Sequence, residues 1–556
     1  MGKTLFAAAA LAVVLSAQGR VDRASRSAAG LSGDADSTAA SSSADGRFTA
    51  FVSAATNLVP GDVNGRRDVF VFDRAVGTIE RISVSSIGVP HDRDATGTPM
   101  ISADGRFVAF TSPSSMLVPA DTNGVDDVFV RDRLLGTTRR VSAPAASEAN
   151  GPSVLAGLSN DGGRVLFQSA ATNLVVGDTN GRDDLFVVAT VGGAPTRVSV
   201  GTGNVQGDAH ARAAALSPNG RWVAFQTATG LFDAYDQNGV DDVYVRDLQS
   251  GVTLRASVSA SGGSPVGACV DPAVADDGSV AFRATSDDVC PGDSNGIDDI
   301  VVRRASATLA VSVAPGGAAA DGLSASPSIS ADGRFVAFAS AATNLVAGDF
   351  NGIPDVFVRD TVGAWTVRVS VDAGGVEAAS PIVCNPFFGC LPLVLAPSIA
   401  AGGRTVVYEH VAPNLTPVND VDFIRDVFAV DVFPRVVGVY VSPVSADLLV
   451  ESPDDPGVPY LGGLSFGYRP GIPFGAATVP LLDDALLAAT LGLSAPPVVG
   501  FAGILSATGT ATASFPRLVD PSLSGIVLRW SCALLDPASS FGVRALMNAA
   551  PIPLGP

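Results

Sequence analysis

Histidine is scarce in this chain, which has only His91, His210 and His410 among its 556 residues. All three precede Ser465, which stands at the centre of a Gly-x-Ser-x-Gly match. A nucleophile elbow of that kind needs an Asp and then a His further along the chain. The sequence therefore excludes a hydrolase triad in that order around Ser465.

Cysteine is also scarce, with five residues and no Cys-x-x-Cys pair. This excludes the common zinc and redox frameworks, and no His-Glu-x-x-His, P-loop or dinucleotide fingerprint is present. In an oxidising compartment we expect Cys384 and Cys390 to pair across a short loop. Cys269 and Cys290 lie in one repeat and could also pair, which leaves Cys532 as a small buried apolar residue.

Lysine is almost absent, since Lys3 is the only one, and arginine carries nearly all the positive charge. The formal net charge of -19 argues against nucleic acid and anionic membrane surfaces as partners. An acidic chain is soluble and could favour cations.

No apolar run has the length of a membrane-spanning helix. The longest N-terminal run, Leu5 to Leu15, follows Lys3 and precedes small residues at Leu15-Ser16-Ala17. This pattern predicts a signal peptide over residues 1–17, with cleavage before Gln18, and a secreted or periplasmic location without membrane insertion. The alternative is a disordered cytoplasmic N-terminus.

One phrase returns seven times between Asp45 and Asp426. Its clearest copy reads SADGRFVAFTS from Ser102, then LVPADTNGVDDVFVRD, then TTRRVS. The first Asp of the polar loop indexes the copies, and subtracting neighbouring positions gives spacings of 59, 57, 58, 57, 56 and 71; these positions are Asp62, Asp121, Asp178, Asp236, Asp293, Asp349 and a degraded copy at Asp420. Tandem copies of this length indicate one supersecondary unit repeated along the chain.

Each copy predicts four strands joined by turns. In the second copy these are Gly97 to Ser102, Phe107 to Ser112, Asp127 to Asp132 and Thr137 to Ser142. Enrichment in Val, Phe, Thr and Arg between Asp-Gly and Asn-Gly turns is typical of strands. Apolar residues occupy both faces, which is typical of sheets covered on two sides.

These phrases resemble the TolB-type, WD40-like propeller repeat (PD40), which reads roughly S-P-D-G-R-x-I-A-F, then I-Y-V-x-D, then R-L-T. The copy at Ser217-Pro218-Asn219-Gly220-Arg221-Trp222-Val223-Ala224-Phe225 is close to that wording, and the resemblance covers about residues 37–441. The seven copies predict seven four-stranded blades, and strand-like apolar runs after Ser442 predict a small C-terminal β-sandwich-like domain, so the chain is expected to be all-β. The resemblance implies a β-propeller fold. It implies little about activity, because propellers carry many functions.

The predicted organisation is a signal peptide at 1–17, the propeller at 30–442 and the C-terminal β domain at 455–556. We expect the first inner strand near Ser37 to Ser43 and the last strand of blade seven near Val436 to Ser442. The ring would then close by packing between the first and last blades, without a strand exchanged between the ends. After a linker at Glu451 to Gly457, Ala485 to Leu491 could form a short helix, and the last domain could anchor, sort or cap.

The loop between the second and third strands reads Asp-x-Asn-Gly-x-x-Asp. Calcium takes oxygen ligands from carboxylates and amides, and Gly permits the sharp turn. The loop resembles the calcium loops of FG-GAP propellers but lacks one Asp-x pair of their pattern. The predicted metal ligands are Asp62, Asn64, Asp68, Asp121, Asn123, Asp127, Asp178, Asn180, Asp184, Asp236, Asn238, Asp242, Asp293, Asn295, Asp299, Asp349, Asn351 and Asp355.

The alternative for these loops is purely structural, because Asn-Gly is a favoured tight turn and Asp side chains bond nearby backbone amides. The degraded copy, with Asp420, Asp422 and Asp426, has Phe423 in place of Gly and is the poorest candidate. In either case the topology places all the acidic loops on one face of the ring.

On function, the sequence predicts a secreted, non-enzymatic binding or scaffold protein with a protein or glycan ligand at the cell envelope, and with calcium as a candidate ligand. The alternative is a carbohydrate-active enzyme, a glycosidase or lyase that uses propeller carboxylates. No acid pair is singled out by the sequence for that role.

Overall fold

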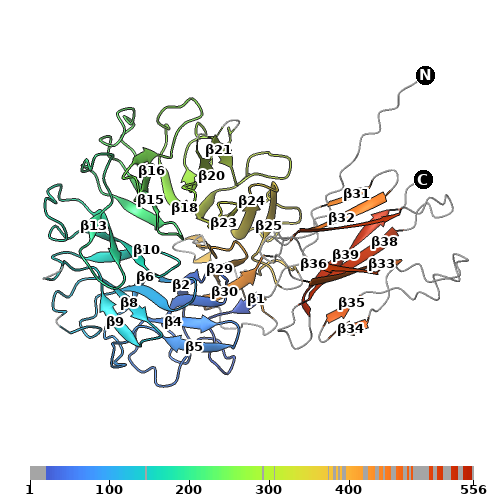
Figure 1. Cartoon of the computed structure of the whole chain (residues 1–556), viewed down its shortest axis with the longest axis horizontal. Helices are drawn as coiled ribbons and strands as arrows, with labels where there is room; N and C mark the ends of the chain where they lie inside the picture. Colours follow the sequence, from blue (N-terminus) through green and yellow to red (C-terminus); the bar gives the residue numbers. More distant parts are fainter. Residues whose placement is uncertain are drawn as a thin grey trace, which may run out of the picture. The chain divides into compact units, whose positions relative to one another are not determined.

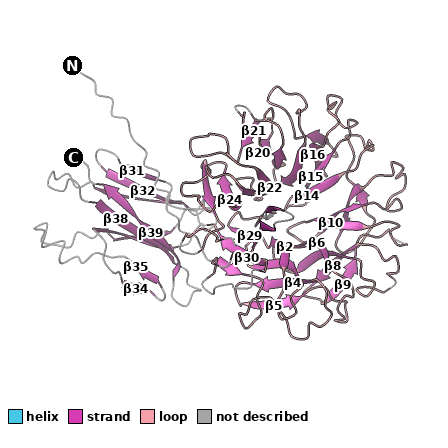
Figure 2. Ribbon diagram, turned by 180° about the vertical axis from the view of Figure 1, so that it is seen from behind, coloured by secondary structure: helices cyan, strands magenta, loops and turns pink. Residues whose placement is uncertain are grey.

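In a computed structural model of the chain, the Val- and Phe-rich segments of the repeat form the central strands of seven antiparallel sheets. The structure describes residues 21–432 apart from 120, 145–146, 291–292, 306, 373–374, 380–383, 386–388, 391–395, 413 and 417–423, and beyond residue 432 only the strands. None of the described residues forms a helix that could cross a membrane (Figure 2).

Blades one to three each consist of four consecutive strands, ordered from the centre outward. Blade one contains β2 (Ser37–Ser42), β3 (Phe48–Ser53), β4 (Asp68–Asp73) and β5 (Thr78–Arg81). Blade two contains β6 (Thr96–Ile101), β7 (Phe107–Ser112), β8 (Asp127–Asp132) and β9 (Thr137–Arg140). Blade three contains β10 (Ser153–Leu158), β11 (Arg164–Ser169), β12 (Asp184–Ala189) and β13 (Thr196–Arg197).

Blades four to six repeat that order. Blade four contains β14 (Arg212–Leu216), β15 (Trp222–Thr227), β16 (Asp242–Asp247) and β17 (Thr253–Arg255). Blade five contains β18 (Cys269–Val274), β19 (Val280–Ala284), β20 (Asp299–Arg304) and β21 (Ala307–Ala310). Blade six contains β22 (Ser324–Ile329), β23 (Phe335–Ser340), β24 (Asp355–Asp360) and β25 (Trp365–Arg368).

Blade seven is built from both ends of the repeat region. Its inner strands are β28 (Ser398–Ile399), β29 (Thr405–His410) and β30 (Asp426–Asp431), and its outer strand is β1 (Val21–Arg23), in the order β1-β30-β29-β28 (Figure 1). The inner strands contact one another in sequence, from β2 through β6, β10, β14, β18 and β22 to β28 and back to β2. The prediction of a seven-bladed, all-β propeller is therefore confirmed.

The expectation that closure uses no exchanged strand is wrong. Residues 438–441 form β31 (Gly438–Val441), which pairs with β32 (Ser445–Glu451) in a different sheet and not with β30. The repeat region forms one compact unit, Arg20–Val432, and residues beyond it belong to a second unit. Because the outer strand of blade seven comes from the N-terminus, hydrogen bonds and not packing alone join the two ends.

The hydrophobic cores lie between blades as well as within them. In six blades an aromatic side chain of the second strand stacks on its cross-strand partner in the third, as Phe110 does on Phe129 with 5.7 Å between ring centroids. One core cluster joins Phe51 and Phe70 of blade one with Val407 and Val427 of blade seven. The two sides of each sheet are therefore covered, which explains the apolar residues on both faces.

On one face of the ring, tight turns lock neighbouring blades together. Gly105 has φ of +72° in the turn of blade two, and a Cβ there would lie 2.3 Å from the ring of Phe48 in blade one. A left-handed turn this close to an aromatic ring requires Gly. This explains why the Asp-Gly pair returns in the repeats.

The second unit contains strands in the segments that the structure describes. β31, β32 and β37 (Thr510–Pro516) form one sheet, and β36 (Gly500–Ile504), β33 (Pro459–Phe466), β38 (Val527–Leu535) and β39 (Val543–Pro553) form another. β34 (Ile472–Phe474) pairs with β35 (Ala477–Val479). Ser465 lies inside β33, paired with Arg529, and not at a turn between a strand and a helix, so it has no elbow geometry.

Other expectations concern residues outside the described set: the signal peptide at 1–17, the linker at 452–457 and the helix at 485–491. For the loop at 384–390, the backbone of β26 (Cys384–Asn385) pairs with β27 (Gly389–Cys390), with Cys384 opposite Cys390. Their side chains are not described, so that disulfide stays a prediction.

Ring closure rests on a buried arginine. Arg74, at the end of β4, pairs with Asp22 of β1 at 3.0 Å and with Asp431 at the end of β30 at 2.7 Å. It also donates to the carbonyl of Gly46 at 3.1 Å. Only 7% of its side chain is exposed, and its single guanidinium connects blade one to β1 and β30 of blade seven.

Replacement of Arg74 by Ala should lower the free energy of unfolding by about 3 kcal/mol, because it removes the cation between two largely buried carboxylates. Urea denaturation followed by tryptophan fluorescence measures this change. Arg47→Ala is the matched control, because Arg47 also pairs with an Asp but is 46% exposed, and we expect a clearly smaller effect. Equal losses in the two variants would show that Arg74 has no special part in closure.

Candidate functional site

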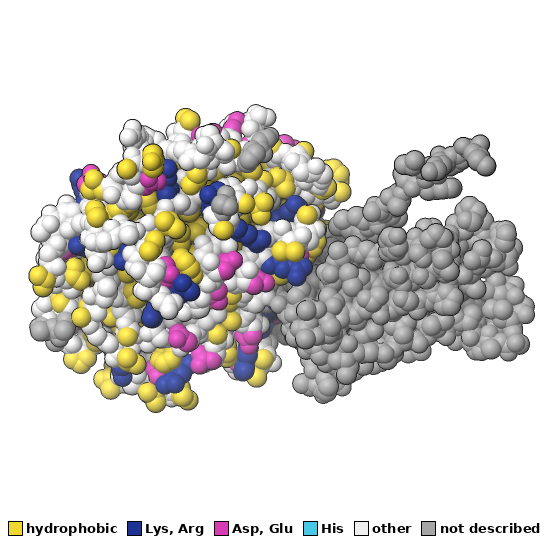
Figure 3. Space-filling model, turned by 45° about the horizontal axis from the view of Figure 1, so that its top comes forward, with side chains coloured by type: hydrophobic (Ala, Val, Ile, Leu, Met, Phe, Trp, Pro, Cys, Tyr) yellow, Lys and Arg dark blue, Asp and Glu magenta, His cyan; other side chains and the backbone are white. Residues whose placement is uncertain are grey.

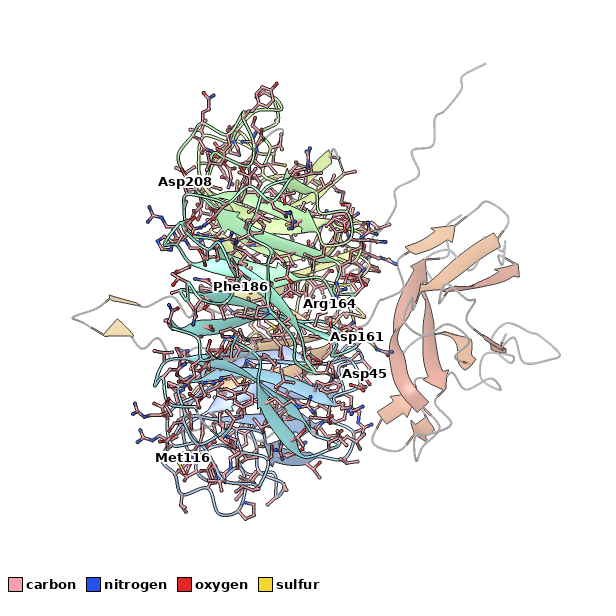
Figure 4. The ribbon with its side chains drawn as sticks, turned by 60° about the vertical axis from the view of Figure 1, so that its left-hand side comes forward. Asp45, Met116, Asp161, Arg164, Phe186 and Asp208 are labelled. Carbon is pink, nitrogen blue, oxygen red and sulfur yellow. The ribbon has the colours of Figure 1, made fainter. Side chains whose placement is uncertain are left out.

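The acidic loops follow the second strand of each blade and end at the first residue of the third strand. Figure 4 shows Met116 of such a loop and Asp208 of a connection between blades on one side of the ring. Asp45, Asp161 and Arg164, which belong to the tight turns, lie on the opposite side. This placement agrees with the prediction that the acidic loops share one face, and we call it the acidic-loop face.

Blade two shows how one loop is held. Asn123 donates from Nδ2 to Asp127 Oδ2 at 3.0 Å, and Ser142 donates from Oγ to Asp127 Oδ1 at 2.6 Å. Arg140 Nη1 lies 2.9 Å from Asp121 Oδ1 and 3.2 Å from Asp127 Oδ2. The guanidinium thus lies between the two carboxylates, and we call this arrangement the carboxylate tie.

The Asn–Asp contact of the tie occurs in six blades. The Nδ2–Oδ2 distances are 2.9 Å for Asn64–Asp68, 3.0 Å for Asn123–Asp127, 3.2 Å for Asn180–Asp184, 2.9 Å for Asn238–Asp242, 3.1 Å for Asn295–Asp299 and 2.9 Å for Asn351–Asp355. Each of these Asn side chains also donates to a backbone carbonyl of the connection that leads to the next blade. The tie therefore fixes the loop to the next blade.

The arginine of the tie comes from the fourth strand in five blades and from β1 in blade seven. The first Asp of the loop is 3.0 Å from Arg81, 2.9 Å from Arg140, 3.3 Å from Arg197, 4.0 Å from Arg255 and 2.9 Å from Arg368. In blade seven, Arg23 Nε lies 3.4 Å from Asp426, and Ser25 donates a short hydrogen bond to the same carboxylate. Arg23-Ala24-Ser25 is thus a sixth, displaced copy of the Arg-x-Ser motif, and it serves blade seven.

The sequence interpretation predicted the aspartates but assigned no role to this arginine and serine. The signal was present, because an Arg-x-Ser motif follows the first loop Asp by 19 residues in five blades, at Arg81, Arg140, Arg197, Arg255 and Arg368. The Asn side chains point their nitrogen at the second Asp, and the oxygen of Asn123 accepts the backbone N–H of Val125 at 3.2 Å. Among the described residues, no three His, Cys, Asp or Glu side chains converge on a point that could hold a metal ion. The Asn amides therefore bond within the tie, and metal binding by these loops stays a prediction.

Burial raises the pKa values of several carboxyl groups in the carboxylate ties. Burial and the charges of Asp127 and Glu148 raise the pKa of Asp121 to about 6, against the opposing effect of Arg140. Burial likewise raises the pKa values of Asp242, Asp299 and Asp349 to about 6. Asp242 and Asp355 are 0% exposed and Asp299 is 6% exposed, so these carboxyls hold neighbouring side chains and do not reach solvent.

Blade one adds a histidine to its tie. His91 Nε2 lies 2.9 Å from Asp68 Oδ1, and its Nδ1 lies 3.4 Å from Ser112 Oγ in blade two. A Ser, His and Asp in line suggest nucleophilic catalysis, but none of the three is more than 1% exposed. No substrate can reach them, so the contact joins two blades.

The residue just before the third strand is not the same type in all seven blades, and we call these seven positions the mouth residues. In six of the seven, the backbone carbonyl accepts an amide at or next to the start of the following inner strand, as Asp126 O does from Ser153 N at 2.7 Å and Arg425 O from Ser37 N at 2.7 Å. They therefore surround the ring's centre on the acidic-loop face. In blade order they are Arg67, Asp126, Asp183, Asp241, Asp298, Pro354 and Arg425.

The mouth residues divide by charge. Blades two to five place four aspartates side by side, whereas blades seven and one place two arginines side by side. Asp183 contacts His210 at 3.3 Å and Asp298 pairs with Arg283 at 2.7 Å, so the acidic sector also carries some basic groups. Elsewhere on the ring, acidic and basic side chains lie next to one another among apolar ones (Figure 3).

The expected disulfide between Cys269 and Cys290 is not formed. Both are buried free thiols in one core cluster with Ala284 and Val289. Cys269 faces Ala284, at the place where blade one has Ser37 bonded to a second serine. The two cysteines pack as small apolar residues, and burial raises the pKa of both thiols.

No protein-family model matches the chain, and no curated protein matches it. Several solved structures are similar. A TolB-type protein from Agrobacterium tumefaciens has a TM-score of 0.31 and 13% identity, over 60% of this chain and 80% of that one. TolB from Acinetobacter baumannii has a TM-score of 0.29 and 16% identity, over 51% and 60%. A prolyl endopeptidase has a TM-score of 0.41 and 12% identity, over 85% and 62%.

This chain spans less than two thirds of the second and third of these structures. TM-scores this low show resemblance and nothing about activity. The number of blades, the strand order and the repeated words nevertheless make the repeat region a TolB-like β-propeller.

The raised carboxyl pKa values give the fold a particular pH dependence. A carboxyl whose pKa is higher in the folded state binds its proton more tightly there, so its contribution to stability is complete below the unfolded value of 3.8 and is lost as the pH rises through about 6. We expect the free energy of unfolding to fall between pH 4 and pH 7, as measured by urea denaturation at fixed ionic strength.

Asp299→Asn should flatten this slope, because it removes one of the titrating groups. Asp247→Asn is the control: a hydrogen bond from Arg221 holds the pKa of Asp247 below its usual range, so it does not titrate in this window. A wild-type stability that rises from pH 4 to pH 7 would contradict the assignment.

Proposed function

We propose that this propeller is a non-enzymatic binding scaffold that recognises a polypeptide partner at the mouth of its acidic-loop face. One observation carries the proposal: the residues repeated in every blade are engaged in ties and cores, whereas the mouth residues vary and separate by charge. Repeated contacts hold the ring, whereas the mouth residues are at least partly exposed, although Asp183 and Asp298 also have partners of opposite charge.

The chemistry of the mouth suggests the partner. Four neighbouring aspartates favour a basic segment, and the two arginines of blades seven and one favour an acidic group beside it. Asp126, Asp183, Asp241 and Asp298 are all partly exposed, as recognition requires. A neutral glycan would make little use of this charge pattern.

The rival function is carbohydrate cleavage by a carboxylate pair. A general acid must lie within hydrogen-bond distance of the substrate atom that it protonates. The carboxyls with the most suitable pKa values, such as Asp242 and Asp299, are buried and bonded to Ser257 and Ser312. This geometry favours binding over catalysis, and calcium is a less suitable ligand because the Asn oxygens are engaged.

The binding proposal is tested with an array of charged peptides and glycans probed with the purified chain. We expect peptides that combine a basic run with an acidic residue to bind, and the double variant Asp183→Asn with Asp241→Asn to weaken binding about tenfold or more. Glu80→Gln, on the outer strand β5, is the control and should leave binding unchanged. Binding of neutral glycans with no effect of the mouth substitutions would overturn the proposal.

We also propose that the chain is exported, since residues 1–17 carry the features of a signal peptide and the net charge is -19. Expression in a bacterium with a standard secretion system should give a mature chain that begins at Gln18, only a few residues before β1. Mass spectrometry of the purified protein measures this. Recovery of the full chain with Met1 in the cytoplasm would count against export.

A further inference from the structure

Blade five lacks the arginine of the carboxylate tie. Its fourth strand has Ala310 where the other copies have Arg, two residues before the tie serine Ser312. The remaining contacts are kept: Asn295 donates to Asp299 at 3.1 Å, and Ser312 donates to Asp299 at 2.5 Å. Blade five therefore has the two carboxylates and the frame that orients them, but no cation of its own between them.

The two carboxylates act on each other. Burial and the nearby Asp293 raise the pKa of Asp299 to about 6. Asp293 is partly exposed, whereas its counterparts Asp62, Asp121 and Asp349 are only 6–7% exposed beneath their arginines. The two carboxyls also hydrogen-bond to each other, and the pair is open to solvent at its first member.

The other blades show what such a pair holds. In blade six, Arg368 Nη1 lies 2.9 Å from Asp349 and 3.3 Å from Asp355. Blade two has nearly the same distances, and in blade four Arg255 also contacts Asp233 at 3.1 Å. In each of these blades the group that contacts the carboxylates is a guanidinium. This contact indicates which ligand such a pair binds, and it does not depend on the number of acidic residues.

Asp233 of blade four shows which other residue borders the corresponding site in blade five. Asp233 stands three residues before the first loop Asp, and Cys290 stands at the same place in blade five. Cys290 is 8% exposed, and the charges of both Asp293 and Asp299 help raise the pKa of its thiol. A compact thiol therefore replaces a carboxylate beside the place that the arginine of blade four fills.

We propose that the Asp293–Asp299 pair of blade five binds a guanidinium group from outside the blade, supplied by an arginine side chain of a partner polypeptide. The inference rests on the proposed function in that the partner is the same basic polypeptide, since the mouth residue Asp298 directly precedes Asp299. A guanidinium fits two carboxylates by charge-assisted hydrogen bonds. Calcium fits less well, because Asn295 Oδ1 already accepts the N–H of Ile297 at 2.7 Å.

Calorimetry with methylguanidinium and with N-acetylarginine methylamide tests the site directly. We expect saturable binding to the wild-type chain and at least about a tenfold loss in Ala310→Arg, which supplies the missing guanidinium from within. Arg368→Ala should create a second site of the same kind in blade six. Tetramethylammonium has the same charge without N–H donors and should not bind saturably.

Equal affinity of methylguanidinium for wild type and Ala310→Arg would overturn the proposal, as would calcium binding that Ala310→Arg abolishes without any guanidinium binding. If Ala310→Arg fails to fold, Arg368→Ala still tests the proposal. Failure of that variant to gain a second methylguanidinium site would contradict a guanidinium as the ligand. Asp183→Asn with Asp241→Asn leaves the blade-five pair intact. Loss of peptide binding in that variant, with methylguanidinium binding kept, separates a failure of this site from a failure of the mouth.

Discussion

The buried carboxylate at the start of each third strand is the group on which the ring depends. It accepts the hydroxyl of the serine two residues after the fourth strand and, in six blades, an Asn amide from its own loop, and in most blades it faces a guanidinium. An ionised carboxylate is costly to bury unless it is paired and hydrogen-bonded, so these partners must be present together. The repeat therefore conserves Asp, Asn, Arg and Ser as one set, and that set joins three strands and the next blade.

Closure uses the same set across the length of the repeat region. Asp426 is bound by Ser25 and Arg23 in the way that Asp127 is bound by Ser142 and Arg140. Ser25 and Asp426 are separated by about four hundred residues, whereas Ser142 and Asp127 are separated by fifteen. A strand of three residues suffices because a tie, a shared core and Arg74 all act at the same junction.

The sequence predicted the strands and the number of blades, because seven copies repeat the same apolar words and turn residues. It did not predict β1, because Asp22-Arg23-Ala24-Ser25 is too short and too far from the other copies to be recognised as one of them. It predicted which aspartates gather, but not that an arginine lies between them, since the direction of a strand-four side chain follows from the sheet. The sequence shows Ala310 in place of this arginine in blade five. The consequence of that replacement follows only from the geometry of the tie. The pairing of Cys269 with Cys290 was wrong because both side chains are core residues.

Hydrogen–deuterium exchange on the chain with and without residues 21–26 tests the central claim most directly, since amide protection reports local opening of individual strands. The account predicts that the shortened chain loses protection in β30, residues 426–431, while β11 and β12 of blade three, on the far side of the ring, keep theirs. Unchanged protection of β30 in the shortened chain would contradict closure by the N-terminal strand.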